Sequence, residues 1–294
     1  MDAIARIRTK LAALPRTENA TLGPVLSEDQ VAGFEQRHGI RLPEEFRQFV
    51  TRVGHGGYGP TYGLLPITRW ASRPGQPAGT SPLIPDAEAP VTRDFPGTIA
   101  VVHGGCLDWT VLVVSGPGRG RLVEVNADGL FAPYFHADAG FLSWYERWLD
   151  FVGRGAGPVD LTWFAQQMAG DEHALLDTLR NDARPRRRRA AAYSFITYPQ
   201  PSGSLPAALV RALAEETDPA VRETIVRALA AQGPHGRELL PAALSDPSPD
   251  VRSLAVILMA PRDHPQMADV LAEHLRAEND DAVRATVRRA LHHE

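Results

Sequence analysis

The stretch SEDQVAGFEQRHGIRLPEEFRQFVTRVGHGGYG, residues 27–59, predicts two short amphipathic helices followed by a glycine turn. Ser27 suits the N-cap of the first helix, because its hydroxyl can accept a hydrogen bond from a free N–H of the first turn. Gly39 can end that helix in a left-handed conformation, and Pro43 suits the first position of the next helix. Closely spaced glycines then prevent the second helix from continuing.

This order of elements, with the residues that follow it, resembles the signature of the SUKH superfamily. The resemblance rests on the Leu-Pro-Glu-Glu-aromatic elbow, the glycine turn and the sequence YGLLPI at residues 62–67, and it extends to about residue 152. It implies an α+β fold and a class of proteins that includes bacterial immunity proteins, which neutralise toxins, and fungal regulators of cell-wall assembly. Family members often carry Asn-Gly-Gly where this chain has His-Gly-Gly at 55–57, and glycine adopts the positive φ values that asparagine tolerates.

The rest of the first half predicts a sheet covered by a helix. Residues 98–103, 109–115 and 121–126 are short runs rich in Val, Ile and Thr, separated by glycine turns, which favours an antiparallel meander. A stripe of large apolar residues at helical spacing follows between Phe141 and Val152 and is typical of a helix that closes a sheet. Residues 69–94 are rich in Pro, Gly and Ser and predict a long surface loop.

The second half of the chain is a repeat. Four arginines, Arg188, Arg222, Arg252 and Arg284, recur at separations of 34, 30 and 32 residues, each preceded by a leucine-rich helical segment. Helix pairs at a period near 30 predict a solenoid, in which each pair buries its apolar face against its neighbours. The motif D-P-x-V-R, complete at residues 218–222, resembles the HEAT repeat, especially its short bacterial type.

These patterns predict an α+β domain followed by an all-α domain. The first, residues 1–152, is a SUKH-like domain with an antiparallel sheet flanked by helices. A glycine-rich linker follows at residues 153–158, and residues 159–294 form a HEAT-like solenoid of about four helix pairs.

The composition favours a cytoplasmic protein that binds neither nucleic acid nor membranes. The formal charge of −4 is spread over both halves, so neither half is a polycation. The single cysteine, Cys106, excludes an internal disulfide framework and fits a reducing compartment. The longest apolar run, residues 254–260, is too short to span a bilayer.

Two groups of residues invite a catalytic or cofactor hypothesis. The sequence GHGGYG at 54–59 has the letters of G-x-G-x-x-G, but the dinucleotide fingerprint requires a preceding strand and a following helix, whereas a helix precedes this one. His103, Cys106 and Asp108 cluster in a turn, yet one cysteine and one nearby histidine fall short of a catalytic or zinc site. We therefore expect a non-enzymatic protein without a catalytic site, cofactor or metal.

Candidate partner-binding residues come from two other segments. Tyr58, Tyr62 and Trp70 lie in or beside the predicted loop and are potential interaction hot spots, with packing under the loop favoured for Tyr62. The arginine run 186–189 also suggests phosphate binding, although a solvated face or salt bridges between domains is favoured. The predicted partner-binding residues are Tyr58, Trp70, Arg186, Arg187 and Arg189.

Together, the family resemblance and the repeats predict a protein that binds other proteins. The leading hypothesis is an immunity protein that binds a toxin domain directly. The alternatives are a scaffold that bridges cellular partners through its SUKH and HEAT surfaces, and a HEAT-type nucleic-acid binder.

Overall fold

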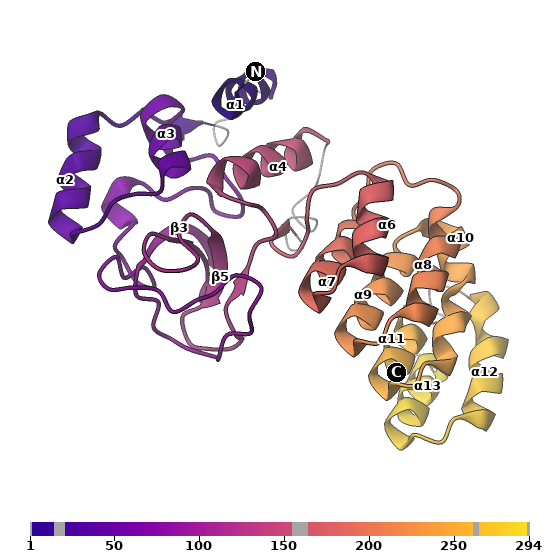
Figure 1. The fold of residues 1–294 in the computed structure, drawn as a ribbon. Helices are drawn as coiled ribbons and strands as arrows, with labels where there is room; N and C mark the ends of the chain where they lie inside the picture. The colour runs from indigo at the N-terminus through magenta and orange to yellow at the C-terminus, as the bar shows by residue number, and fades with distance from the viewer. Residues whose placement is uncertain (1, 15–20, 155–163, 261–264, 293–294) are drawn as a thin grey trace. The chain divides into compact units, whose positions relative to one another are not determined.

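The computed structural model describes residues 2–14, 21–154, 164–260 and 265–292. The chain divides into two compact units, residues 1–165 and 166–294 (Figure 1). The first contains helices and antiparallel sheets and the second is helical, so the predicted fold class is confirmed. The predicted linker, residues 153–158, lies outside the described residues from 155 onward, and Gly153 is the last residue of helix α4.

The helices of the first unit begin and end largely where local chemistry predicts. Ser27 and Gln30 form a capping box at the start of one helix, and Gly39 ends it with a φ of 65°. Pro43 lies at the N-cap of the next helix, one position earlier than predicted. The helices are α1 (Ala3–Ala13), α2 (Glu28–His38), α3 (Glu44–Arg52), the 3-10 helix η1 (Ile67–Arg69) and α4 (Phe141–Gly153).

The main sheet of the first unit is an antiparallel meander with the strand order β3-β4-β5-β6. A second, two-stranded sheet pairs β1 with β2, a pairing that the sequence did not predict. The strands are β1 (Leu22–Gly23), β2 (His55–Gly57), β3 (Thr98–Gly105), β4 (Asp108–Val113), β5 (Leu122–Asn126) and β6 (Tyr134–Phe135).

Side chains alternate between the two faces of the main sheet along each strand, and each face contributes to a core. Leu112 and Leu122 belong to the core beneath the four helices. Val111 and Val123 lie on the opposite face, in a second core that also contains Leu83 from the segment before β3. Figure 1 shows this long segment beside the strands. The segment predicted to be a surface loop therefore covers one face of the sheet and contributes to a core.

The second unit consists of four helix pairs stacked in sequence order (Figure 1). The pairs are α6 (Glu172–Asn181) with α7 (Pro185–Ser194), α8 (Leu205–Glu215) with α9 (Pro219–Ala230), α10 (Gly233–Glu238) and η2 (Leu240–Ser245) with α11 (Pro249–Leu258), and η3 (Pro265–Met267) and α12 (Ala268–Ala277) with α13 (Asp281–His292). In the third pair a short α-helix followed by a 3-10 helix replaces the first helix.

A polar residue occupies the N-cap of the second helix in each later pair: Asp218, Ser248 and Asp280. The carboxylate of Asp218 accepts hydrogen bonds from the N–H groups of Ala220 and Val221, as an N-cap should. Ser248 occupies the equivalent position but its side chain makes no capping bond, and the carboxylate of Asp246 instead accepts the N–H of Ser248.

In the described ranges, no helix has both the length and the apolar character that a membrane crossing requires.

Candidate functional site

Four exposed apolar side chains lie in, or in segments next to, the turns at one end of the main sheet. Tyr62 is 75% exposed, Leu107 42%, Leu130 82% and Val91 59%. We call these four residues the hairpin patch. Their exposure is notable because the unit has ample buried core elsewhere, and exposed apolar clusters on a folded domain are typical of interaction surfaces.

The four members of the hairpin patch are linked through short contacts between neighbouring turns. A Cβ on Gly105 would lie 3.3 Å from the ring of Tyr62, so this glycine lets the ring lie against the β3–β4 turn. The carbonyl of Leu107 accepts a hydrogen bond of 2.8 Å from the N–H of Ala127, which ties the β3–β4 turn to the loop that carries Leu130.

The loop that carries Leu130 is fixed from both sides. The side-chain oxygen of Asn126 accepts the N–H of Leu130 at 2.9 Å, and its amide donates to Asp108 at 2.7 Å. A Cβ on Gly129 would lie 3.2 Å from Cγ1 of Val91, so the fourth member of the patch adjoins the same loop. The hairpin patch is therefore built on hydrogen-bonded turns at the end of a rigid sheet.

Acidic side chains lie on the loops that carry the hairpin patch. Glu88, Asp94 and Asp128 are exposed and belong to the same loops as Val91 and Leu130. The guanidinium of Arg93 lies among them and donates to the carbonyl of Asp128 at 2.8 Å. An apolar centre with an acidic rim matches a partner surface that has an apolar centre and basic side chains around it.

Trp70 is not a surface residue, which corrects the expectation of an exposed hot spot there. It is 1% exposed, and its Nε1–H donates to the carbonyl of Leu65 at 2.8 Å. The indole packs edge-on against Phe34, with ring centroids 5.3 Å apart, and lies close to Phe46. Trp70 therefore joins η1 to the helical core.

Tyr58 and Tyr62 also differ in their surroundings. The Tyr58 ring is partly buried and packs edge-on against Trp148, with centroids 4.7 Å apart, and burial raises the pKa of the Tyr58 hydroxyl. Tyr62, for which packing under the loop was favoured, is instead the exposed one and stacks on His103 at 5.6 Å between centroids. Packing under the loop is therefore wrong for Tyr62.

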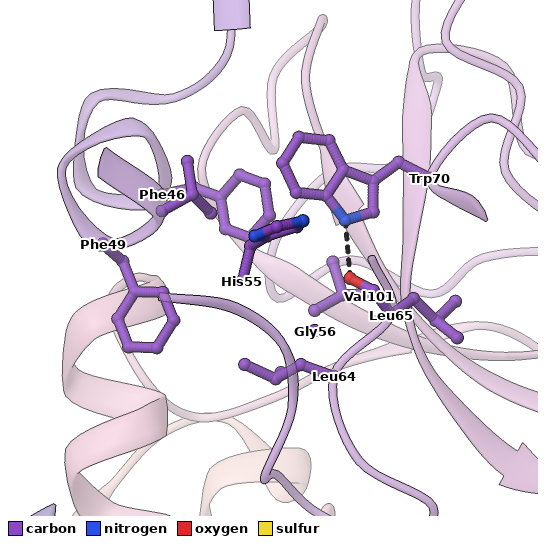
Figure 2. A pocket seen from close by; sticks show the side chains of 9 residues that line it. Phe46, Phe49, His55, Gly56, Leu64, Leu65, Trp70 and Val101 are labelled. Carbon is purple, nitrogen blue, oxygen red and sulfur yellow. Dashed lines mark hydrogen bonds between the residues drawn. The ribbon is translucent and has the colours of Figure 1, made fainter. Parts of the chain in front are cut away.

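A small cavity lies beside Trp70 between α3 and the strand segment around residue 56 (Figure 2). It has room for no more than about one water molecule. Its lining is almost entirely apolar, and the imidazole Nδ1 of His55 lies 2.6 Å from the carbonyl of Pro24. The cavity is thus a packing defect of the core and too small for a cofactor.

His103, Cys106 and Asp108 lie in the β3–β4 turn without forming a catalytic arrangement. Nε2 of His103 lies 3.3 Å from the carbonyl oxygen of Cys106, while the Asp108 carboxylate accepts from Asn126. Cys106 is exposed and has a φ of 46°, a left-handed conformation that shapes the turn. Among the described residues, no group of three or more His, Cys, Asp or Glu side chains could hold a metal ion.

The four recurring arginines of the second unit form a series that we call the arginine ladder: Arg188, Arg222, Arg252 and Arg284. Arg252 shows the geometry. Its Nε and Nη2 donate to the carboxylate of Glu278 in the next helix pair at 2.8 and 2.9 Å, and its Nη1 donates to the carbonyl of Asp246 at 2.8 Å. Equivalent pairs join Arg188 to Glu216 and Arg222 to Asp246.

The carboxylates of the arginine ladder also organise the loops between helices. Glu278 accepts the backbone N–H groups of Asn279 and Asp280 at 2.9 and 2.8 Å. The hydrogen bond from Arg252 outweighs burial and lowers the pKa of Glu278 to about 2. Each ladder carboxylate therefore joins two helix pairs and shapes the turn that follows it.

The arginine run at 186–189 is largely engaged within the second unit. Arg187 pairs with Asp182 at 2.8 Å, and Arg188 belongs to the arginine ladder. The guanidinium of Arg189 lies over the ring of Tyr193, 5.3 Å from its centroid. Arg186 is exposed. These arginines therefore do not form a free cationic row, and the pairs of Arg187 and Arg188 lie within the repeats.

Sequence reasoning did not single out Leu107 and Leu130, the members of the hairpin patch nearest the strand ends. Each is a large apolar residue inside a turn, in the sequences GGCLDW at 104–109 and NADGLF at 126–131. Turns favour Gly, Asn, Asp and Ser, so a leucine at such a position was a usable signal of an interaction surface.

The comparisons with known proteins agree with this architecture. Residues 25–178 match the SMI1 / KNR4 family (SUKH-1), and residues 205–292 match HEAT repeats. No curated protein and no solved structure matches the chain. The first match covers more than half of the 294 residues and includes helices α2 and α3, the glycine turn and the meander. The chain belongs to the SMI1 / KNR4 family (SUKH-1), with HEAT repeats in its second unit.

Proposed function

We propose that this protein is a non-enzymatic immunity protein that neutralises a toxin by binding it directly through the hairpin patch. The observation that carries the proposal is the cluster of Tyr62, Leu107, Leu130 and Val91, exposed at the end of a rigid sheet. Membership of the SUKH-1 family supports a protein-binding role, since immunity proteins occur in that superfamily. The HEAT repeats support the same class of role.

The chemistry of the hairpin patch narrows the toxin surface that it fits. An aromatic ring and two leucines offer apolar area at the centre, which is where binding energy concentrates in protein interfaces. The exposed carboxylates of Glu88, Asp94 and Asp128 would face basic side chains at the rim. We therefore expect a toxin domain with a basic rim around an apolar recess, and association that slows as salt increases.

Rescue of growth tests the proposal. Cells would express the toxin domain encoded next to the gene of this chain, together with the full-length chain or its variants. Leu107→Asp and Leu130→Asp place a charge in the hairpin patch at exposed positions and should abolish rescue. Val25→Asp changes an exposed apolar residue elsewhere in the same unit and should leave rescue intact. Full rescue by both patch variants would refute the proposed surface.

A scaffold that bridges two cellular partners is the second candidate, and the observation that favours it is the solenoid in the same chain. Solenoids present extended surfaces for binding. Affinity capture with the full chain from its native cytoplasm separates the two functions. Recovery of a toxin domain that is lost with Leu130→Asp supports immunity, whereas recovery of housekeeping complexes alone supports the scaffold and contradicts immunity.

A further inference from the structure

The arginine ladder is complete inside the second unit and open at its last member. The first three arginines each use the Nε and Nη2 edge of the guanidinium to bind a carboxylate of the following helix pair. Arg284 keeps the backbone contact that Nη1 makes in Arg252. Its Nη1 donates to the carbonyl of Glu278 at 2.8 Å and to that of Leu275 at 3.1 Å. Within the described residues, no carboxylate meets its Nε and Nη2 edge.

The residue four positions after each ladder arginine also differs between the first three pairs and the last pair. In the first three pairs this residue is small or β-branched and fully buried: Ala192, Val226 and Val256. In the last pair it is Arg288, which is exposed. Residues four apart share a helix face, so Arg284 and Arg288 lie together on the end face of α13.

On a helix face that no further pair covers among the described residues, charged side chains are expected from solubility alone. Solubility explains Arg288, but it does not require the Arg284 side chain to keep its ladder contact to the carbonyl six residues earlier. That contact fixes one Nη and leaves the bidentate edge of the guanidinium open. A guanidinium edge held in this way favours a carboxylate, whose two oxygens match its paired donors.

We infer that the end face of α13 is a docking site for an acidic residue of a partner protein, bound by Arg284 with Arg288 beside it. The carboxylates that the first three ladder arginines bind indicate what kind of residue would bind Arg284. Glu216, Asp246 and Glu278 each lie in a loop just before a helix and also accept a backbone N–H of that loop. The partner therefore presents an Asp or Glu in the turn before an amphipathic helix, as a fifth repeat would.

A second copy of this chain does not supply that residue. The position equivalent to Glu216 at the start of the solenoid is Asp182, which already pairs with Arg184 and Arg187. The hydrogen bond from Arg184 is the largest of the causes that keep the pKa of Asp182 well below its usual range. Because this carboxylate is occupied, head-to-tail stacking of copies would have to break existing ion pairs.

A peptide taken from the ladder itself tests the site. The probe is a fluorescein-labelled synthetic peptide with the sequence of residues 277–292, which carries a ladder glutamate followed by its helix. Fluorescence anisotropy would measure its binding to the full-length chain at low salt. The same peptide with Glu278→Gln removes one charge and keeps the rest of the sequence, and it should bind about tenfold more weakly.

Protein variants localise the binding. Arg288→Gln lies at an exposed position and should weaken binding of the unmodified peptide several-fold, whereas Arg276→Gln removes another exposed charge, from α12, and should not. Arg284→Lys keeps the charge but loses the paired donors. It should therefore reduce the difference in affinity between the unmodified peptide and the Glu278→Gln peptide. Circular dichroism would verify that each variant is folded.

Four outcomes would overturn the inference. The first is a lack of binding of the unmodified peptide at low salt, and the second is a loss of binding on Arg276→Gln as large as that on Arg288→Gln. An oligothymidylate that binds more tightly than the peptide, and depends on Arg284 and Arg288, would assign the face to phosphate. Self-association lost on Arg284→Lys would assign it to a second copy. None of these results bears on the hairpin patch, so this site and the proposed function can fail independently.

Discussion

The carboxylate of Glu45 accepts a hydrogen bond from the backbone N–H of Leu142, with 3.0 Å between Oε2 and the nitrogen. Glu45 lies in the first turn of α3 and Leu142 in the first turn of α4. The carboxylate thereby satisfies a free N–H of α4 and lies at the positive end of its dipole. A residue of the Leu-Pro-Glu-Glu elbow thus caps the helix that closes the sheet.

Gly140→Ala tests this cap. A Cβ at residue 140 would lie 2.3 Å from Oε2 of Glu45, so we expect the substitution to displace the carboxylate and destabilise the first unit by about 1 kcal/mol, the value of the lost cap. Glu45→Ala removes the cap and should cost about 1 kcal/mol. The double variant should lose less than the sum of the two, because without the carboxylate the new methyl group has room.

Chemical denaturation followed by tryptophan fluorescence measures this effect, since all five tryptophans precede residue 166. Gly33→Ala is the matched control: it makes the same substitution inside α2, where a Cβ would meet nothing within 4 Å. It should be neutral or slightly stabilising. Equal unfolding midpoints for Gly140→Ala and Gly33→Ala would contradict the proposed role of the glycine.

Asp246→Asn tests the arginine ladder. The Asp246 carboxylate is buried and binds Arg222 of the preceding pair. Loss of its charge leaves a largely buried guanidinium without a counter-ion, and we expect a loss of about 3 kcal/mol. Glu215→Gln is the control, because it weakens an exposed pair with Arg180 and should cost less than about 1 kcal/mol. The free energies of unfolding would be measured by urea denaturation, followed by circular dichroism at 222 nm. Similar losses of stability for the two variants would argue against the arginine ladder as a stabilising element.

The arginine ladder also predicts how the second unit responds to acid. The pKa of Glu278 falls from its ordinary value of 4.5 to about 2 in the folded chain, so the folded state favours the ionised carboxylate. Its contribution is therefore fully present above pH 4.5 and is lost as the pH falls towards about 2. The protection factors of α11 and α13 peptides in hydrogen exchange, which correct for the slower intrinsic exchange at low pH, should fall across this window.

Glu278→Gln provides the control for the acid prediction. The variant cannot titrate at this position, so its stability should be lower than that of the wild type at pH 7, and the difference should shrink as the pH approaches 2. A difference that stays constant from pH 7 to pH 2 would show that ionisation of Glu278 does not contribute to the stability of the fold.

The parts of the fold that depend on local chemistry were readable from the sequence. Ser27 and Gly39 act on their own helix, so a cap can be recognised from the residue type and its neighbours. The regular spacing of the ladder arginines was recognised from the sequence, but the carboxylates that they bind were not. An acidic residue nevertheless stands six positions before each ladder arginine. The bond crosses from one pair to the next, and a pattern within a single repeat does not show it.

The candidate site was less predictable, because exposure depends on tertiary packing. Trp70 and Tyr62 lie in similar glycine- and proline-rich sequence, yet one is buried between α2 and α3 and the other stands on the surface. What separates them is tertiary packing, since the Trp70 ring lies against Phe34 and Phe46 of two helices that are distant in sequence. The same holds for Leu83, which shares a core cluster with Val113 of β4, and such contacts have no local sequence signature.

Val251→Asp tests the register of the whole solenoid. Val251 precedes a ladder arginine and has no exposed surface, so an aspartate there buries an unpaired charge between helix pairs. We expect a loss of more than about 4 kcal/mol and unfolding of the second unit, seen as lost ellipticity at 222 nm. Ile257→Asp makes a similar change on the same helix α11 at a residue that is 60% exposed, and should leave the helical signal in place. If both variants melted with the wild type, Val251 would not face the neighbouring pair, and the repeat register on which the arginine ladder depends would be wrong.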